Sequence, residues 1–208
     1  MNFELKDRTI WILTALIVAA LAVAGYFVLR GAKYQKVADA VVDRPSENDP
    51  VSEGYVWQGG PDDPKKIIIA KIGVDNFIQQ VGVNEKNEIA APINIFLAGW
   101  YNQSPRPGQK GLSVIDGHRD GFKKDGIFRN LSQLQTGDEL SIEFGNGSSK
   151  KFRVLGVNEV EQKDAMASLF SQNPKVKSQL NLVTCGGNYD KSKQYYDKRI
   201  IVSTEQVN

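Results

Sequence analysis

Three side chains in this sequence of 208 residues could together carry out acyl transfer through a thioester. Cys185 is the only cysteine, His118 is the only histidine, and Arg199 begins an apolar run near the C-terminus. Each stands at an end of a short apolar run, so we expect each at a strand edge. A thiolate is a strong nucleophile for amides, an imidazole can move the protons, and a guanidinium can stabilise an oxyanion.

Each of these residues also has a structural interpretation when it is taken alone. A lone cysteine cannot form an internal disulfide, and it is either a reactive free thiol or a small buried hydrophobe. A lone histidine is more often structural, and a lone arginine is more often a solvated charge. Asp116 and Asp120 flank the histidine. Asp120 could hydrogen-bond the imidazole or cap a turn.

Composition limits the classes of function that fit the chain. The formal net charge is +2, and lysine and arginine form no cluster longer than a pair, so a nucleic-acid partner is not expected. The length allows one domain with an appendage. No acidic cluster matches a calcium site convincingly, and we expect neither a metal nor another cofactor.

The N-terminal region predicts a membrane anchor. The segment Thr9–Leu29 contains no charged residue and is bracketed by Arg8 and Arg30. Its 21 residues would form a helix about 31 Å long, which is enough to cross a bilayer core. The alternative is a cleaved signal peptide, since Ala22–Ala24 has the A-x-A form of a cleavage site. The apolar run continues beyond that point, which favours an uncleaved anchor.

The expected domain organisation follows from this anchor. Residues 1–8 form a tail short enough to be retained in the cytoplasm, 9–29 the anchor, 30–65 a linker or arm, and 66–208 the domain in which acyl transfer would take place. The arm is rich in proline and acidic residues, and Tyr55, Val56 and Trp57 form an apolar island in it. We expect this island to dock on the domain surface rather than to form a flap over a site.

From Lys66 onward, short apolar runs alternate with turn residues, which is typical of a closed β barrel. The segment Gly145–Gly147 is a strong hairpin signal, and Gly186–Lys198 reads as a long loop. Short helical pieces are expected over 128–134 and over 164–171, where Asp164 could cap. About eight strands are expected, at 66–72, 77–83, 95–101, 111–116, 140–144, 151–160, 180–184 and 199–204.

The chain resembles the sortases, the membrane-anchored cysteine transpeptidases of bacterial cell surfaces. The resemblance rests on Asn181–Cys185 as a T-L-x-T-C-like strand, on Gly117–His118, and on Arg199 in the next strand, in the order of the family. Asn181 stands where threonine is usual. The region Gly99–His118 is similar to that of the single-domain actinobacterial-type sortases of classes F and E. The resemblance implies a mostly β fold, an eight-stranded barrel with one or two short helices after the N-terminal transmembrane helix.

The resemblance also implies roles for particular residues. Cys185 would be the nucleophile, His118 the general acid and base, and Arg199 the transition-state stabiliser. Thr184 would shape the pocket or contact the substrate backbone, and Asp120 would support the histidine. An apolar pocket for the substrate could be lined by Ala165, Met166, Leu169 and Phe170, although one helix face packing on the barrel explains these residues equally well.

The expected partners are surface proteins with an LPXTG-like C-terminal sorting signal and an amine from a cell-wall peptide or a pilin lysine. The catalytic domain would then be extracellular on a single-pass membrane protein. The basic residues on both sides of the anchor do not decide this orientation. The alternatives are an L,D-transpeptidase-like peptidoglycan enzyme and a non-catalytic membrane-anchored domain that binds a surface partner.

Overall fold

The computed structural model describes residues 45–85, 87–192 and 195–207. The expected anchor Thr9–Leu29 lies outside these residues. Among the residues described, no helix has the length and apolar character needed to cross a membrane.

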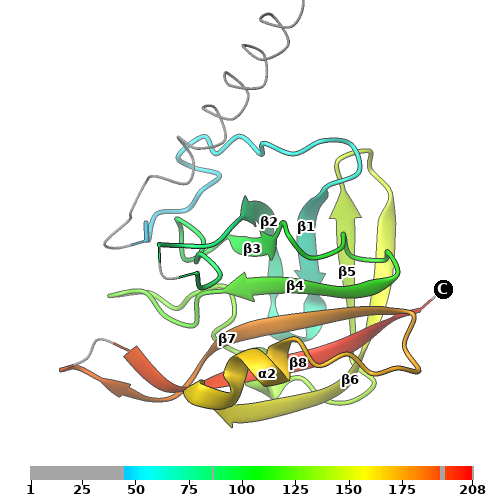
Figure 1. The fold of residues 1–208 in the computed structure, drawn as a ribbon. Helices are drawn as coiled ribbons and strands as arrows, with labels where there is room; N and C mark the ends of the chain where they lie inside the picture. The colour runs from blue at the N-terminus through cyan, green and yellow to red at the C-terminus, as the bar shows by residue number, and fades with distance from the viewer. Residues whose placement is uncertain (1–44, 86, 193–194, 208) are drawn as a thin grey trace, which may run out of the picture. The chain divides into compact units, whose positions relative to one another are not determined.

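Eight strands close into a barrel, in the order β1-β2-β3-β4-β7-β8-β6-β5 (Figure 1). The β2–β3 and β4–β7 pairs are parallel, whereas the other neighbouring pairs are antiparallel. The strands are β1 (Pro64–Ile69), β2 (Val74–Val81), β3 (Ala98–Tyr101), β4 (Gly111–Gly117), β5 (Glu139–Phe144), β6 (Ser149–Glu161), β7 (Ser178–Asp190) and β8 (Tyr195–Val207). The predicted mostly β, eight-stranded barrel is therefore confirmed.

Both faces of the central strands are buried. Ile115 and Leu182 point into the barrel core, whereas their neighbours Val114 and Val183 belong to a second apolar cluster. This second cluster includes Leu169 from the short helix α2 (Ala165–Leu169), which lies in front of β7 and β8 in Figure 1. Burial on two faces explains why β4 and β7 read as nearly continuous apolar runs rather than as alternating ones.

The predicted loop Gly186–Lys198 is largely wrong. β7 continues to Asp190 and β8 begins at Tyr195, so the two strands form a hairpin that projects beyond the barrel (Figure 1). Their register shifts between Gly186 and Tyr189, and the rings of Tyr189 and Tyr196 lie 5.0 Å apart across the hairpin. Cross-strand aromatic pairs stabilise such ladders even when the intervening sequence is polar.

The helical predictions are right in place and too long in extent. Before α2 comes a 3-10 turn over Gln162–Asp164, and Asp164 makes no side-chain capping bond. The segment 128–134 contains only a 3-10 turn, Leu131–Gln133. A further 3-10 turn, Ala70–Ile72, ends the first predicted strand early, because the chain reverses there toward β2.

The hairpin predicted at Gly145–Gly147 is confirmed as the turn between β5 and β6. The amide of Gly147 donates to the carbonyl of Phe144 at 2.9 Å, and the side chain of Asn146 accepts from the amide of Ser148 at 2.9 Å. Gly147 has a φ of 81°, a conformation that glycine adopts at low cost.

The arm that precedes β1 docks on the barrel, as the apolar island predicted. The Trp57 indole donates to the carbonyl of Ile78 at 3.1 Å, and the ring of Tyr55 lies 5.6 Å from that of Phe77. Both contacts are to β2. The arm is the cyan segment in Figure 1.

Candidate active site

The pairing of β4 with β7 brings the histidine and the cysteine to one edge of the barrel. The two strands are parallel, with Asp116 opposite Val183. Two positions further along lie His118, just beyond the end of β4, and Cys185, still within β7, so this register places the two residues side by side. The Thr184 hydroxyl, which is buried, donates to the carbonyl of Gly117 at 2.7 Å and ties the two strand ends together.

The pairing of β7 with β8 adds the arginine. Cys185 lies directly opposite Arg199 in the antiparallel ladder. The Arg199 guanidinium donates from Nη1 to the carbonyls of Tyr196 at 3.0 Å and of Lys198 at 2.8 Å. Cys185 and Arg199 therefore lie on paired strands, and His118 directly follows β4 beside them. The strand ends expected at Cys185 and Arg199 are not found, because β7 continues to Asp190 and β8 begins at Tyr195.

The Cys185 thiol is half-buried, and its pKa is raised above the ordinary value chiefly because burial disfavours the thiolate. Arg199 and, more weakly, Arg119 oppose this shift, whereas Asp116 and Asp120 add to it. Burial thus favours the protonated thiol. A base would therefore be needed for this thiol to act as a nucleophile.

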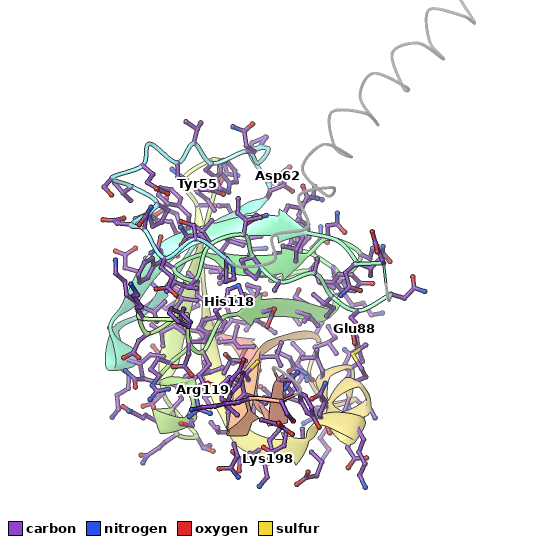
Figure 2. The ribbon with its side chains drawn as sticks, turned by 90° about the vertical axis from the view of Figure 1, so that its left-hand side faces the viewer. Tyr55, Asp62, Glu88, His118, Arg119 and Lys198 are labelled. Carbon is purple, nitrogen blue, oxygen red and sulfur yellow. The ribbon has the colours of Figure 1, made fainter. Side chains whose placement is uncertain are left out.

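The imidazole of His118 has a defined partner. Its Nε2 lies 2.7 Å from the carbonyl oxygen of Pro92. A carbonyl can only accept, so Nε2 carries a proton and Nδ1 is the nitrogen that can gain or lose one. Figure 2 shows His118 near the middle of the face that carries the site, with Arg119 nearer the hairpin side.

Asp116 is a second acidic group at this edge, for which the sequence predicted no role. It is half-buried beside β3, opposite Gly99. Burial raises the pKa of its carboxyl, and His118, the amide of Gly117 and Arg199 oppose that shift. A carboxylate inside an apolar strand was the only sequence signal of its position.

The comparison with protein families decides the identity of the fold. A family model described as the Sortase domain matches residues 67–207, which is most of the chain. The chain belongs to the sortase family.

Solved sortase structures share the same fold. They include the Sortase D5 transpeptidase of Clostridium perfringens, at 23% identity and a TM-score of 0.52 over 76% of this chain and 86% of that chain. A lid mutant of Sortase A from Corynebacterium diphtheriae gives 22% identity and a TM-score of 0.54, over 84% and 89% of the two chains. Sortase C-1 of Actinomyces oris gives 21% identity and a TM-score of 0.53, over 85% of this chain and 95% of that chain. No curated protein sequence matches the chain. At these identities the likeness shows the fold, and the class F/E assignment stays a prediction.

In this sortase Asp120 holds the loop after the histidine rather than the imidazole. Its carboxylate accepts from the Arg129 guanidinium and, at 2.6 Å, from the Tyr196 hydroxyl. Arg119 lies 5.0 Å from the ring centroid of Tyr196 and donates to the carbonyl of Gly187 at 3.1 Å. Burial, together with Asp120, raises the pKa of Tyr196 to about 12. This network joins the histidine segment to the β7–β8 hairpin.

The sequence did not single out Arg119 or Tyr196. Both act through tertiary contacts between segments far apart in the chain, so no local pattern could have identified them.

Of the residues expected to line a substrate pocket, some are buried against the barrel and others are exposed. Ala165 and Leu169 are buried, and Leu169 packs against Val114, Val183 and Ile201. Met166 is 52% exposed, so it remains available to a ligand. Packing of one helix face on the barrel, the alternative explanation, therefore accounts for Ala165 and Leu169. A substrate contact at Met166, or at Thr184, stays a prediction.

The ring of Phe170 packs edge-on against Tyr101, with 6.1 Å between the centroids. Among the described residues, no group of three or more histidine, cysteine, aspartate or glutamate side chains could hold a metal ion.

Proposed function

We propose that this sortase cleaves an LPXTG-like sorting signal through a thioester at Cys185 and transfers the protein to an amine. The observation that carries the proposal is the pairing of Cys185 with Arg199 between β7 and β8, with His118 directly after the end of β4, the strand that pairs with β7 on its other side. Family membership independently supports a cysteine transpeptidase.

The first half-reaction needs the base because the resting group is a thiol. As the sulfur of Cys185 attacks the scissile carbonyl, its proton passes to Nδ1 of His118. The resulting imidazolium then donates that proton to the departing amine as the C–N bond breaks and the thioester remains. Pro92 keeps the other ring proton on Nε2 throughout, because its carbonyl accepts it at 2.7 Å.

The second half-reaction reverses the roles. An incoming amine attacks the thioester carbonyl, the C–S bond breaks, and an amide forms. His118 takes the proton released by the amine and returns one to the sulfur of Cys185. The guanidinium of Arg199 can donate N–H groups to the substrate oxygen, on which negative charge develops in both steps.

The anchor is part of the proposal. Thr9–Leu29 would hold the enzyme in the cell membrane with the catalytic domain outside, where sorting signals and acceptor amines meet. A membrane-impermeant thiol reagent, applied to intact cells after any outer envelope is removed, should label Cys185. Labelling that required cell lysis would refute this orientation.

The chemistry is tested by incubating the full-length protein with a sorting-signal peptide and a small amine, and by following the products by mass spectrometry. We expect cleavage, an amide product, and a thioester on Cys185 that hydroxylamine releases. Cys185→Ala should abolish all three. Peptide bound without covalent capture would instead indicate a non-catalytic binding domain, and transfer restricted to peptidoglycan stem peptides would indicate the L,D-transpeptidase chemistry.

A further inference from the structure

A short segment of the arm lies between two loops, one of which contacts His118 and the other of which begins with it. We call Ser46–Asn48 the entry segment, Pro92–Ile95 the proline loop and His118–Gly126 the histidine loop. Pro92 accepts the ring proton of His118 at 2.7 Å, whereas the histidine loop begins at His118 itself. Contacts that fix the distance between the two loops therefore also fix the position of the imidazole relative to the Pro92 carbonyl.

The entry segment pairs with the proline loop through the backbone. The amide of Ser46 donates to the carbonyl of Ile93 at 2.8 Å, and the amide of Ile95 donates to the carbonyl of Ser46 at 2.9 Å. The side-chain amide of Asn94, which is buried, donates to the carbonyl of Asn48 at 2.9 Å.

Glu47 reaches the histidine loop from the same segment. Its carboxylate accepts a hydrogen bond from the backbone amide of Phe122. It also accepts from the backbone amide of Lys123, which lies 3.1 Å from one carboxylate oxygen and 3.0 Å from the other. Lys124 donates from Nζ to the carbonyl of Glu47 at 2.9 Å. Hydrogen bonds to an ionised acceptor are roughly twice as strong as neutral ones. The tip of the loop is thus held by a carboxylate from the arm.

The histidine loop transmits this hold to its base. The amide of Gly121 donates to the carbonyl of Lys124 at 2.7 Å, and the amide of Gly126 donates to that of Arg119 at 2.8 Å. At Gly126 a Cβ would lie 2.3 Å from the carbonyl oxygen of His118, so the two sides of the loop are in close contact there. A displacement of the tip therefore moves His118.

We propose that Glu47 is a positioning residue for His118. By holding the histidine loop while its own segment pairs with the proline loop, it keeps Nε2 against the Pro92 carbonyl and leaves Nδ1 for proton transfer. This inference rests on the proposed function for its effect on catalysis. The arm then contributes to the site by contact, in addition to connecting it to the N-terminal segment.

The test uses full-length protein in detergent or nanodiscs, free of a histidine tag and labelled with ¹⁵N-histidine. Because His118 is the only histidine, its ring nitrogens give a single set of signals, which report the tautomer directly. The variants are Glu47→Ala, Gly121→Ala and their double variant. Glu139→Ala serves as the control, since this half-exposed glutamate pairs with Arg153 on the barrel surface at 3.6 Å.

In Glu47→Ala we expect the Nε2–H signature of His118 to become a mixture of tautomers, and kcat to fall about tenfold while KM changes less. Gly121→Ala should act similarly, because its Cβ would lie 2.6 Å from the Glu47 carboxylate and displace it. The double variant should be no worse than Glu47→Ala alone, since the colliding group is gone. Glu139→Ala should leave both the tautomer and kcat unchanged.

An unchanged tautomer and unchanged kcat in Glu47→Ala would overturn the inference, and so would additive losses in the double variant. A wild-type protein that cleaves no sorting peptide would refute the proposed function instead. The tautomer measurement still decides the role of Glu47 in that event, since it does not depend on turnover.

Discussion

The bond between Thr184 and Gly117 links the segments that carry the proposed nucleophile and the proposed base, because Thr184 precedes Cys185 and Gly117 precedes His118. Thr184→Val removes the hydroxyl and keeps the side-chain shape, so no cavity forms. It leaves the carbonyl of Gly117 without this buried donor. Losing one partner of a buried neutral hydrogen bond costs about 1–3 kcal/mol. For a domain of this size about 2 kcal/mol lowers Tm by about 4–8 °C.

Thr204 provides a matched control. Its hydroxyl is equally buried and donates to the carbonyl of Leu180 at 2.8 Å, across the β7–β8 pair. Leu180 lies five positions before Cys185 in β7, which at the strand rise is about 16 Å away. Thr204→Val should therefore lower Tm by a similar amount without moving the catalytic groups.

The two variants should differ in turnover. A displacement of catalytic groups by about 1 Å can cost on the order of a hundredfold in rate, so we expect a loss of kcat for Thr184→Val beyond its effect on stability. Thr184→Ser, which retains the hydroxyl, should recover most of the rate. The assay is peptide cleavage well below Tm, with the folded fraction measured by circular dichroism. Equal kcat values for Thr184→Val and Thr204→Val would refute the claim that this bond aligns the site.

Three further predictions concern charge and docking. The pH dependence of the alkylation of Cys185 by iodoacetamide reports the pKa of the thiol. Its midpoint should move to higher pH in Arg199→Ala, which removes a cation that lowers this pKa, and to lower pH in Asp116→Asn, which removes an anion that raises it. Shifts of the midpoint in the opposite directions would contradict this electrostatic picture. Arg199→Lys should leave the pKa of the thiol nearly unchanged, because the positive charge is kept, but it should lower the rate of peptide cleavage, because an ammonium lacks the planar fork of donors. A near-normal rate of cleavage would show that charge suffices. Trp57→Phe should cost about 1 kcal/mol in the free energy of unfolding, measured with urea, through loss of the bond to Ile78, while kcat stays unchanged; a large loss of kcat would instead assign the docked ring a part in catalysis.

The strands could be predicted because they depend on local sequence, and the same local pattern singled out the candidate residues. Apolar runs bounded by turn residues locate each strand, and Cys185, His118 and Arg199 stand at the ends of three of them. Which strands pair was not readable from these runs. The meeting of the three residues depends on the parallel β4–β7 pair, in which two strands distant in the sequence run side by side.

What the sequence missed depends on long-range contacts. The β7–β8 hairpin continues through a polar segment, where the rings of Tyr189 and Tyr196 pack against each other across the two strands. Glu47 looked like one more charge in a polar linker, and only the fold places its carboxylate against the amides of Phe122 and Lys123. The Pro92 carbonyl likewise reaches His118 from a loop that local pattern leaves unassigned.

The parallel β4–β7 pair also has a consequence for folding, because it joins strands that are far apart in the sequence. The chain between His118 and Cys185 contains β5, β6 and α2, so His118 is synthesised well before Cys185 and the two meet only when the barrel closes. Non-local parallel pairing is slow, because loop-closure entropy is lost before contacts compensate for it. A newly synthesised chain therefore passes through a stage in which its one thiol is exposed and not yet beside His118. The thiol becomes half-buried when the barrel closes, so a fall in its rate of alkylation would report completion of the fold.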